Sequence, residues 1–79
     1  MEYFEDEDFE LMFRTFDFFK KDEIPLSYLF HGLNVINYEH DRDAIITKYK
    51  LSESENLGKK AFLKIMKREY NKMITLENS

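Results

Sequence analysis

The chain has no cysteine, one proline and two glycines among its 79 residues. Without cysteine it can form no disulfide, no thiolate metal site and no thiol nucleophile. So few prolines and glycines argue against a turn-rich β protein and favour helices joined by short connections. No apolar run approaches the roughly 18 residues of a membrane span, and the acidic first residues do not resemble a signal peptide. We therefore expect a small soluble domain in the cytoplasm, with no membrane partner.

Aromatic residues are plentiful, with eight phenylalanines and five tyrosines, and the hydrophobic share is 43%. Disordered chains are depleted in such residues, so the composition predicts a folded chain. Its length leaves room for a single hydrophobic core. We therefore treat residues 1–79 as one domain.

The net charge of −4 is divided unevenly along the chain. Residues 1–40 carry ten acidic and three basic side chains, whereas residues 41–79 carry six acidic and nine basic ones. A chain that is acidic at one end is poorly suited to duplex DNA, so we expect no nucleic-acid partner. The acidic half could attract a basic peptide. Its first acidic residues could equally serve as favourable charges at a helix N-terminus.

Apolar residues recur at helical spacing in four segments, which predicts an all-α fold. Proline is tolerated in the first turn of a helix and not further in, so Ile24-Pro25 separates the first two helices. Asp6 or Asp8 could cap the first helix. The predicted helices cover residues 6–18, residues 26–36, a short segment that follows Asp41 as N-cap, and a stretch from Ala61 to Met73 before a frayed end at 75–79.

The two halves of the chain repeat one hydrophobic pattern. Phe13-x-x-Phe16-Asp17 is followed seven residues later by Ile24, and Ile46-x-x-Tyr49-Lys50 is followed seven residues later by Leu57. If Asp17 and Lys50 are the first positions of two loops, Ile24 and Leu57 both occupy position 8 of their loop.

This frame resembles the paired EF-hand domain of the calmodulin, centrin and myosin light-chain superfamily. Residues 13–17 resemble the end of that family's first helix, and residues 61–67 resemble its last helix. The resemblance implies two helix-loop-helix units, with hand 1 at about 6–37 and hand 2 at about 40–74. It also implies a short β-bridge between the loops through Ile24 and Leu57. An ordinary four-helix bundle with loops that match by chance is the alternative.

The first loop departs from the calcium-binding pattern. A calcium loop needs side-chain oxygens at positions 1, 3, 5 and usually 9, a bidentate glutamate at 12, and glycine at 6. Only the first of the five ligand positions here carries a carboxylate, and Asp22 stands where glycine belongs. The five positions hold Asp17, Phe19, Lys21, Pro25 and Tyr28.

The second loop departs from the calcium-binding pattern as strongly as the first. Lys50 would repel the ion at position 1, and Ala61 cannot replace the bidentate glutamate. Ser52 and Ser54 are weak ligands. We therefore expect neither hand to bind calcium and no cofactor to be needed. A residual calcium site improvised from backbone carbonyls, the two serines and Glu55 is the alternative.

Other catalytic or metal-binding patterns are lacking. His31 and His40 lie nine residues apart, with no cysteine or carboxylate pair at ligand spacing, so we expect surface or half-buried histidines. The sequence contains no glycine-rich phosphate loop and no convincing nucleophile, histidine and carboxylate arrangement. We expect no enzymatic activity.

The resemblance implies a calcium-independent adaptor that clasps an amphipathic, basic helix such as the IQ motif of myosin necks, which would place it near the cytoskeleton. The same residues could instead form the core. The expected groove consists of Phe13, Phe16, Leu29, Leu33, Ile36, Ile45, Tyr49, Phe62, Ile65 and Met66. Four large residues fall beside the main stripes and predict a surface contact. They are Met12, Phe18, Phe19 and Phe30.

Two other arrangements remain open. The domain could form a homodimer, as the two-handed S100 group does, by burying its surplus aromatic residues against a second copy. A chain of this length could also be one lobe of a longer, four-handed protein.

Overall fold

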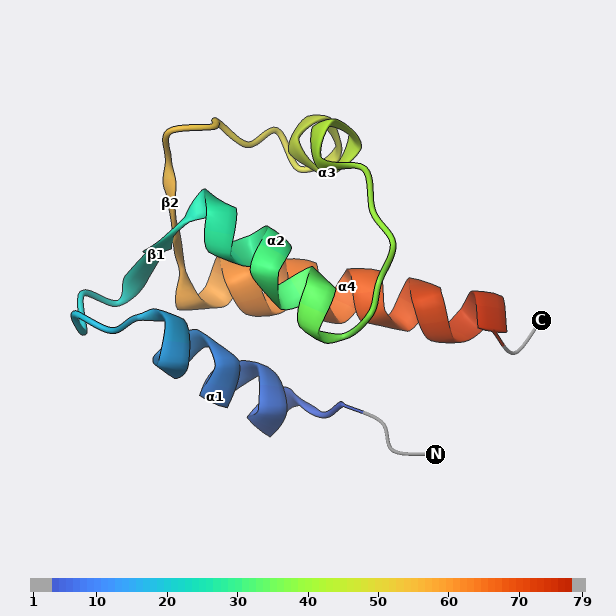
Figure 1. The fold of residues 1–79 in the computed structure, drawn as a ribbon, viewed down its shortest axis with the longest axis horizontal. Coiled ribbons are helices and arrows are strands. Elements are labelled where there is room, and N and C mark those ends of the chain that lie inside the picture. Colours follow the sequence, from blue (N-terminus) through green and yellow to red (C-terminus); the bar gives the residue numbers. More distant parts are fainter. Residues whose placement is uncertain (1–3, 78–79) are drawn as a thin grey trace.

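The structure is a computed structural model that describes the backbone of residues 4–77 and the side chains of residues 4–75. Figure 1 shows α2 and α4 between α1 and α3, with a small sheet at one end. The elements are α1 (Asp6–Phe16), β1 (Glu23–Pro25), α2 (Leu26–Val35), α3 (Arg42–Lys48), β2 (Asn56–Gly58) and α4 (Lys59–Glu77).

The small sheet joins the two loops back to back. Strands β1 and β2 pair antiparallel, with Ile24 directly opposite Leu57, and both side chains are buried. This pair confirms the predicted β-bridge. Residues 4–77 thus form a mostly helical domain of four helices with a two-stranded sheet between its loops, consistent with paired helix-loop-helix units.

Helix α1 ends at Phe16, two residues earlier than the sequence predicts. The N-cap of α1 is Glu5 and neither of the predicted caps, because Asp6 and Asp8 both lie inside the helix. The Asp8 carboxylate, at the third helical position, accepts a hydrogen bond from the backbone N–H of Glu5. At its end the chain turns into the loop through Lys20 and Asp22, which both have positive φ. The prediction that the helix reaches residue 18 was therefore wrong.

Helices α2 and α3 start where the sequence predicts, whereas α4 begins at Lys59, two residues before the predicted start at Ala61. Pro25 immediately precedes α2, and the Asp41 carboxylate accepts hydrogen bonds from the N–H groups of Asp43 and Ala44 at the start of α3. Helix α4 continues to Glu77 and covers part of the predicted frayed end, while residues 78–79 lie outside the described residues. With nineteen residues α4 is the longest element, and α1, α2 and β2 pack against it.

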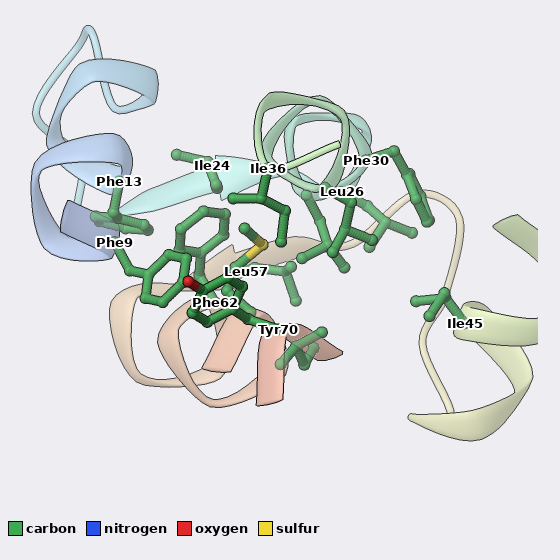
Figure 2. Close-up of a cluster of buried hydrophobic side chains, with 14 residues drawn as sticks. Phe9, Phe13, Ile24, Leu26, Phe30, Ile36, Ile45, Leu57, Phe62 and Tyr70 are labelled. Carbon is green, nitrogen blue, oxygen red and sulfur yellow. The ribbon is translucent and has the colours of Figure 1, made fainter. Parts of the chain in front are cut away.

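The core lies around the middle of α4. In Figure 2 phenylalanines of α1 and α4 point toward one another, whereas Ile45 lies at the edge of the cluster on α3. A Cβ atom on Gly32 would lie only 3.1 Å from the Met12 sulfur and 3.2 Å from the Met66 methyl carbon, so glycine leaves room for these two side chains against α2. The buried residues are Phe9, Phe13, Ile24, Leu26, Leu29, Phe30, Leu33, Ile36, Ile45, Leu57, Phe62, Ile65, Met66 and Tyr70.

Across residues 4–77, no helix combines the length and the apolar character that crossing a bilayer would require.

Candidate functional site

The first loop is closed by its own aspartate. The two carboxylate oxygens of Asp17 accept hydrogen bonds from the backbone N–H groups of Lys21 at 2.9 Å and Asp22 at 2.8 Å. Asp17 is the residue at the first ligand position of the EF-hand pattern. Both of its oxygens accept hydrogen bonds within the loop. The carboxylate therefore stabilises the turn that a bound ion stabilises in a calcium-binding loop.

Replacing Asp17 with alanine should lower the free energy of unfolding by about 1 kcal/mol, the usual effect of losing a side chain that caps backbone N–H groups. Asp17→Asn, which keeps one carbonyl acceptor, should lose less. Urea denaturation measures both. An unchanged stability in Asp17→Ala would contradict the role of the carboxylate in closing the loop.

The second loop is closed in a comparable way. The Glu55 carboxylate accepts a hydrogen bond from the backbone N–H of Ser52, and the Glu55 N–H donates back to the Ser52 carbonyl. Glu55 was one of the residues proposed for a residual calcium site. Among residues 4–77, no three acidic or histidine side chains converge in a way that could hold a metal ion.

Two phenylalanines project from the first loop. Phe18 and Phe19 are 79% and 78% exposed, and their rings meet edge to face with centroids 5.3 Å apart. The Lys21 ammonium lies 5.9 Å from the centre of the Phe19 ring. Large apolar groups are seldom left this exposed together without a binding role. We call Phe16, Phe18, Phe19, Pro25 and Tyr28 the aromatic tip.

A small cavity of about 190 Å³ lies within the aromatic tip. Phe16 and Tyr28 form one wall, with ring centroids 5.5 Å apart. Asp17, Glu23 and Lys21 bring two negative charges and one positive charge to the lining. The cavity is large enough for one apolar side chain, with acidic groups at its border for a basic flank. Its lining consists of Phe16, Asp17, Phe18, Phe19, Lys21, Glu23, Pro25, Tyr28 and Asn56.

The residues predicted to line a partner groove form the core instead. Phe16 and Tyr49 are half-buried, and the other eight are buried. They pack against one another because a domain of this size needs nearly all its large apolar groups to be stable. The eight buried residues are therefore not available to a partner in this structure, whereas Phe16 also forms one wall of the cavity in the aromatic tip.

Two of the four residues predicted to form a surface contact are exposed. Phe18 and Phe19 are exposed, but Phe30 is buried beneath a stacked His40 ring and the Arg42 guanidinium. Met12 is half-buried against the core, where its sulfur faces Gly32. The connector after α2 folds back over Phe30, and helical periodicity cannot reveal such cover. His40 is half-buried and His31 exposed, as expected.

A buried carboxylate that we did not predict as a site ties α3 to α4. Glu69 is 1% exposed, and its oxygens accept hydrogen bonds from Tyr38 at 3.0 Å, Lys48 at 2.7 Å and Tyr49 at 2.6 Å. Burial alone would raise the pKa of Glu69, but these three donors outweigh it and lower the pKa. One signal was present in the sequence, since Glu69 falls within the apolar stripe of the last helix, seven residues after Phe62.

The hydroxyl groups of Tyr38 and Tyr49 both donate hydrogen bonds to Glu69. Burial first, and then the hydrogen bond to Glu69, raises the pKa of Tyr38 and of Tyr49 above the ordinary tyrosine value. Helix α3 buries only Ile45, so this polar cluster supplies much of what holds α3 in place.

Comparison of the chain with protein-family models, with curated proteins and with solved structures found no match. The resemblance to paired EF-hands therefore rests on the residues and the geometry described above.

Proposed function

We propose that this chain is a calcium-independent, EF-hand-like protein-binding module that holds an amphipathic, basic helix of a partner, in the manner of a light chain or centrin. The observation that carries the proposal is the aromatic tip, which sits on a loop closed by Asp17. Because Asp17 closes this loop, no bound ion is needed to hold Phe18 and Phe19 in their exposed positions. The β-bridge between Ile24 and Leu57 supports the two-handed arrangement.

The aromatic tip is the first contact for the partner helix. Helices that bind in this mode insert apolar anchors one turn apart, and the tip cavity accepts one such anchor. Asp17 and Glu23 at its border favour lysine or arginine beside the anchor. A partner that used the predicted groove would first have to displace part of the core, whereas the tip needs no rearrangement. An IQ-type segment has the required chemistry.

Calorimetry with a basic IQ-type peptide tests the proposal. We expect the peptide to bind equally with calcium and with a chelator, because neither loop offers a ligand set. Phe18→Ser with Phe19→Ser should weaken binding at least about tenfold, as the loss of central aromatic contacts usually does. Val35→Ser is the matched control, since Val35 is an exposed apolar residue on α2, outside the tip.

Two results would contradict the proposal. Calcium binding at micromolar concentration would make the domain a sensor, and unchanged peptide affinity in the double serine variant would remove the tip from the interface. The tip sequence Phe-Phe-Lys-Lys also calls for a vesicle control with anionic lipid. Tip-dependent binding to vesicles without binding to the peptide would assign the tip to a lipid surface instead.

A further inference from the structure

We propose that the outer face of α4 binds the acidic face of α1 in a second copy of this chain. Four exposed cations form a row along the outside of α4, at intervals of four residues. Residues at this spacing lie on one side of a helix, and this row points away from the core residues Phe62 and Met66. We call Lys60, Lys64, Arg68 and Lys72 the basic ridge.

The basic ridge is not neutralised within the described part of the chain. The ion pairs that α4 forms there use Lys59, Lys67 and the buried Glu69, and none uses a residue of the ridge. Beside the ridge is a shallow hollow of about 480 Å³ that contains the half-buried side chain of Leu63. The surface thus combines a row of positive charges with one apolar contact point.

The exposed side of α1 has the complementary chemistry. Leu11 is 61% exposed, and Glu7 and Asp8, which precede it by four and three residues, are exposed on the same side of the helix. Arg14, one turn further on, is the one cation of α1. We call Glu7, Asp8 and Leu11 the acidic face. It offers an apolar side chain for the hollow at Leu63 and carboxylates for the ridge.

The same two helices already pair in this way inside the chain. Asp6 lies 3.0 Å from Lys67 and Glu10 lies 3.4 Å from Lys59, so one side of α1 meets one flank of α4 through ion pairs. The acidic face of α1 and the basic ridge of α4 both lie outside that contact. A second copy can therefore repeat, between molecules, a contact that each molecule makes within itself.

A second copy fits the basic ridge better than a nucleic acid does. The acidic residues of α1 lie next to α4, where they would repel a polyanion as wide as a duplex. A single helix with a few carboxylates is narrow enough to contact the ridge alone. This inference concerns α1 and α4 and does not depend on the aromatic tip.

Sedimentation equilibrium of the whole chain tests the proposal. The weight-average mass should rise above the 9.7 kDa of one chain with increasing concentration, and less so at high salt, because exposed ion pairs are screened. Lys64→Glu with Arg68→Glu should weaken association at least about tenfold, and so should Glu7→Lys with Leu11→Ser. Lys20→Glu with Lys50→Glu, and Glu39→Lys with Val35→Ser, are controls at exposed positions outside both faces and should associate normally.

Mixing the two deficient variants is the decisive measurement. The ridge variant keeps an intact acidic face and the α1 variant keeps an intact ridge. At a concentration where each variant alone is a monomer, the mixture should therefore form a one-to-one pair. A wild-type chain that remains a monomer close to millimolar concentration would overturn the proposal. Failure of the mixture to associate would overturn it as well, because the two faces would then not be partners.

Discussion

Replacing Phe62 with alanine is expected to lower the free energy of unfolding by about 3–5 kcal/mol, the usual effect of removing a fully buried aromatic ring. Phe62 is 0% exposed, and its ring contacts those of Phe13 and Phe16 at centroid distances of 5.7 and 6.2 Å. A domain of this size has a total stability near the lower end of about 5–15 kcal/mol. We therefore expect Phe62→Ala to be largely unfolded at physiological temperature, as near-ultraviolet circular dichroism would show.

Phe19→Ala is the matched control, because it removes the same ring from an exposed position. Its effect on stability should stay within about 0.5 kcal/mol. Phe62→Leu should lose less than Phe62→Ala and keeps the comparison measurable by urea denaturation if the alanine variant does not fold. Equal losses for Phe62→Ala and Phe19→Ala would contradict the placement of the core.

The second large effect concerns Glu69. Glu69→Ala leaves the hydroxyls of Tyr38 and Tyr49 without their acceptor and Lys48 without its partner. Breaking a buried, hydrogen-bonded charge pair costs about 3 kcal/mol or more, and we expect a loss near that value because Lys48 can turn toward solvent. Chemical denaturation measures the loss. Hydrogen exchange should show that amides of α3 lose protection first.

Glu53→Ala is the control for this change. Glu53 also pairs with a cation, Arg42 at 3.2 Å, but both side chains are largely exposed. Exposed ion pairs contribute about 0–1 kcal/mol, so this substitution should change stability little. Similar losses in the two variants would mean that Glu69 is not shielded from water.

Glu69 also makes the free energy of unfolding depend on pH. Because its pKa is lower in the folded chain than the ordinary glutamate value of 4.5, its contribution is complete above that value. The contribution disappears as pH falls through the lower folded-state pKa. The raised pKa values of Tyr38 and Tyr49 act at the other end, and their contribution declines as pH rises above the ordinary tyrosine value of 10.0. In Glu69→Ala the free energy of unfolding should therefore decrease less as the pH falls below 4.5.

Local patterns in the sequence predicted much of the fold. The helical spacing of apolar residues, the N-cap at Asp41 and the break at Pro25 act between near neighbours, and the structure contains these features. The pairing of Ile24 with Leu57 is a contact between distant residues that the internal repeat revealed. The end of α1 was predicted wrongly because the hydrogen bonds of Asp17 favour the loop over two more helical residues.

The candidate site could be predicted only in part. Neighbouring phenylalanines beside the helical stripe pointed to Phe18 and Phe19, which are exposed. The same reasoning failed for Phe30, since His40 and Arg42 cover it from a segment that comes later in the chain. Periodicity shows which side of a helix is apolar, but not whether another segment covers it.

The sequence by itself determined four helices, two loops without a calcium ligand set and an acidic half followed by a basic half, because each of these depends on residue type and short spacing. Only the tertiary structure decided that eight of the ten expected groove residues are buried in the core and that a charged Glu69 lies among three donors. It also decided which cations of α4 are paired with α1 and which remain outside. These outcomes depend on how distant segments pack, since burial and charge pairing arise only when the helices come together.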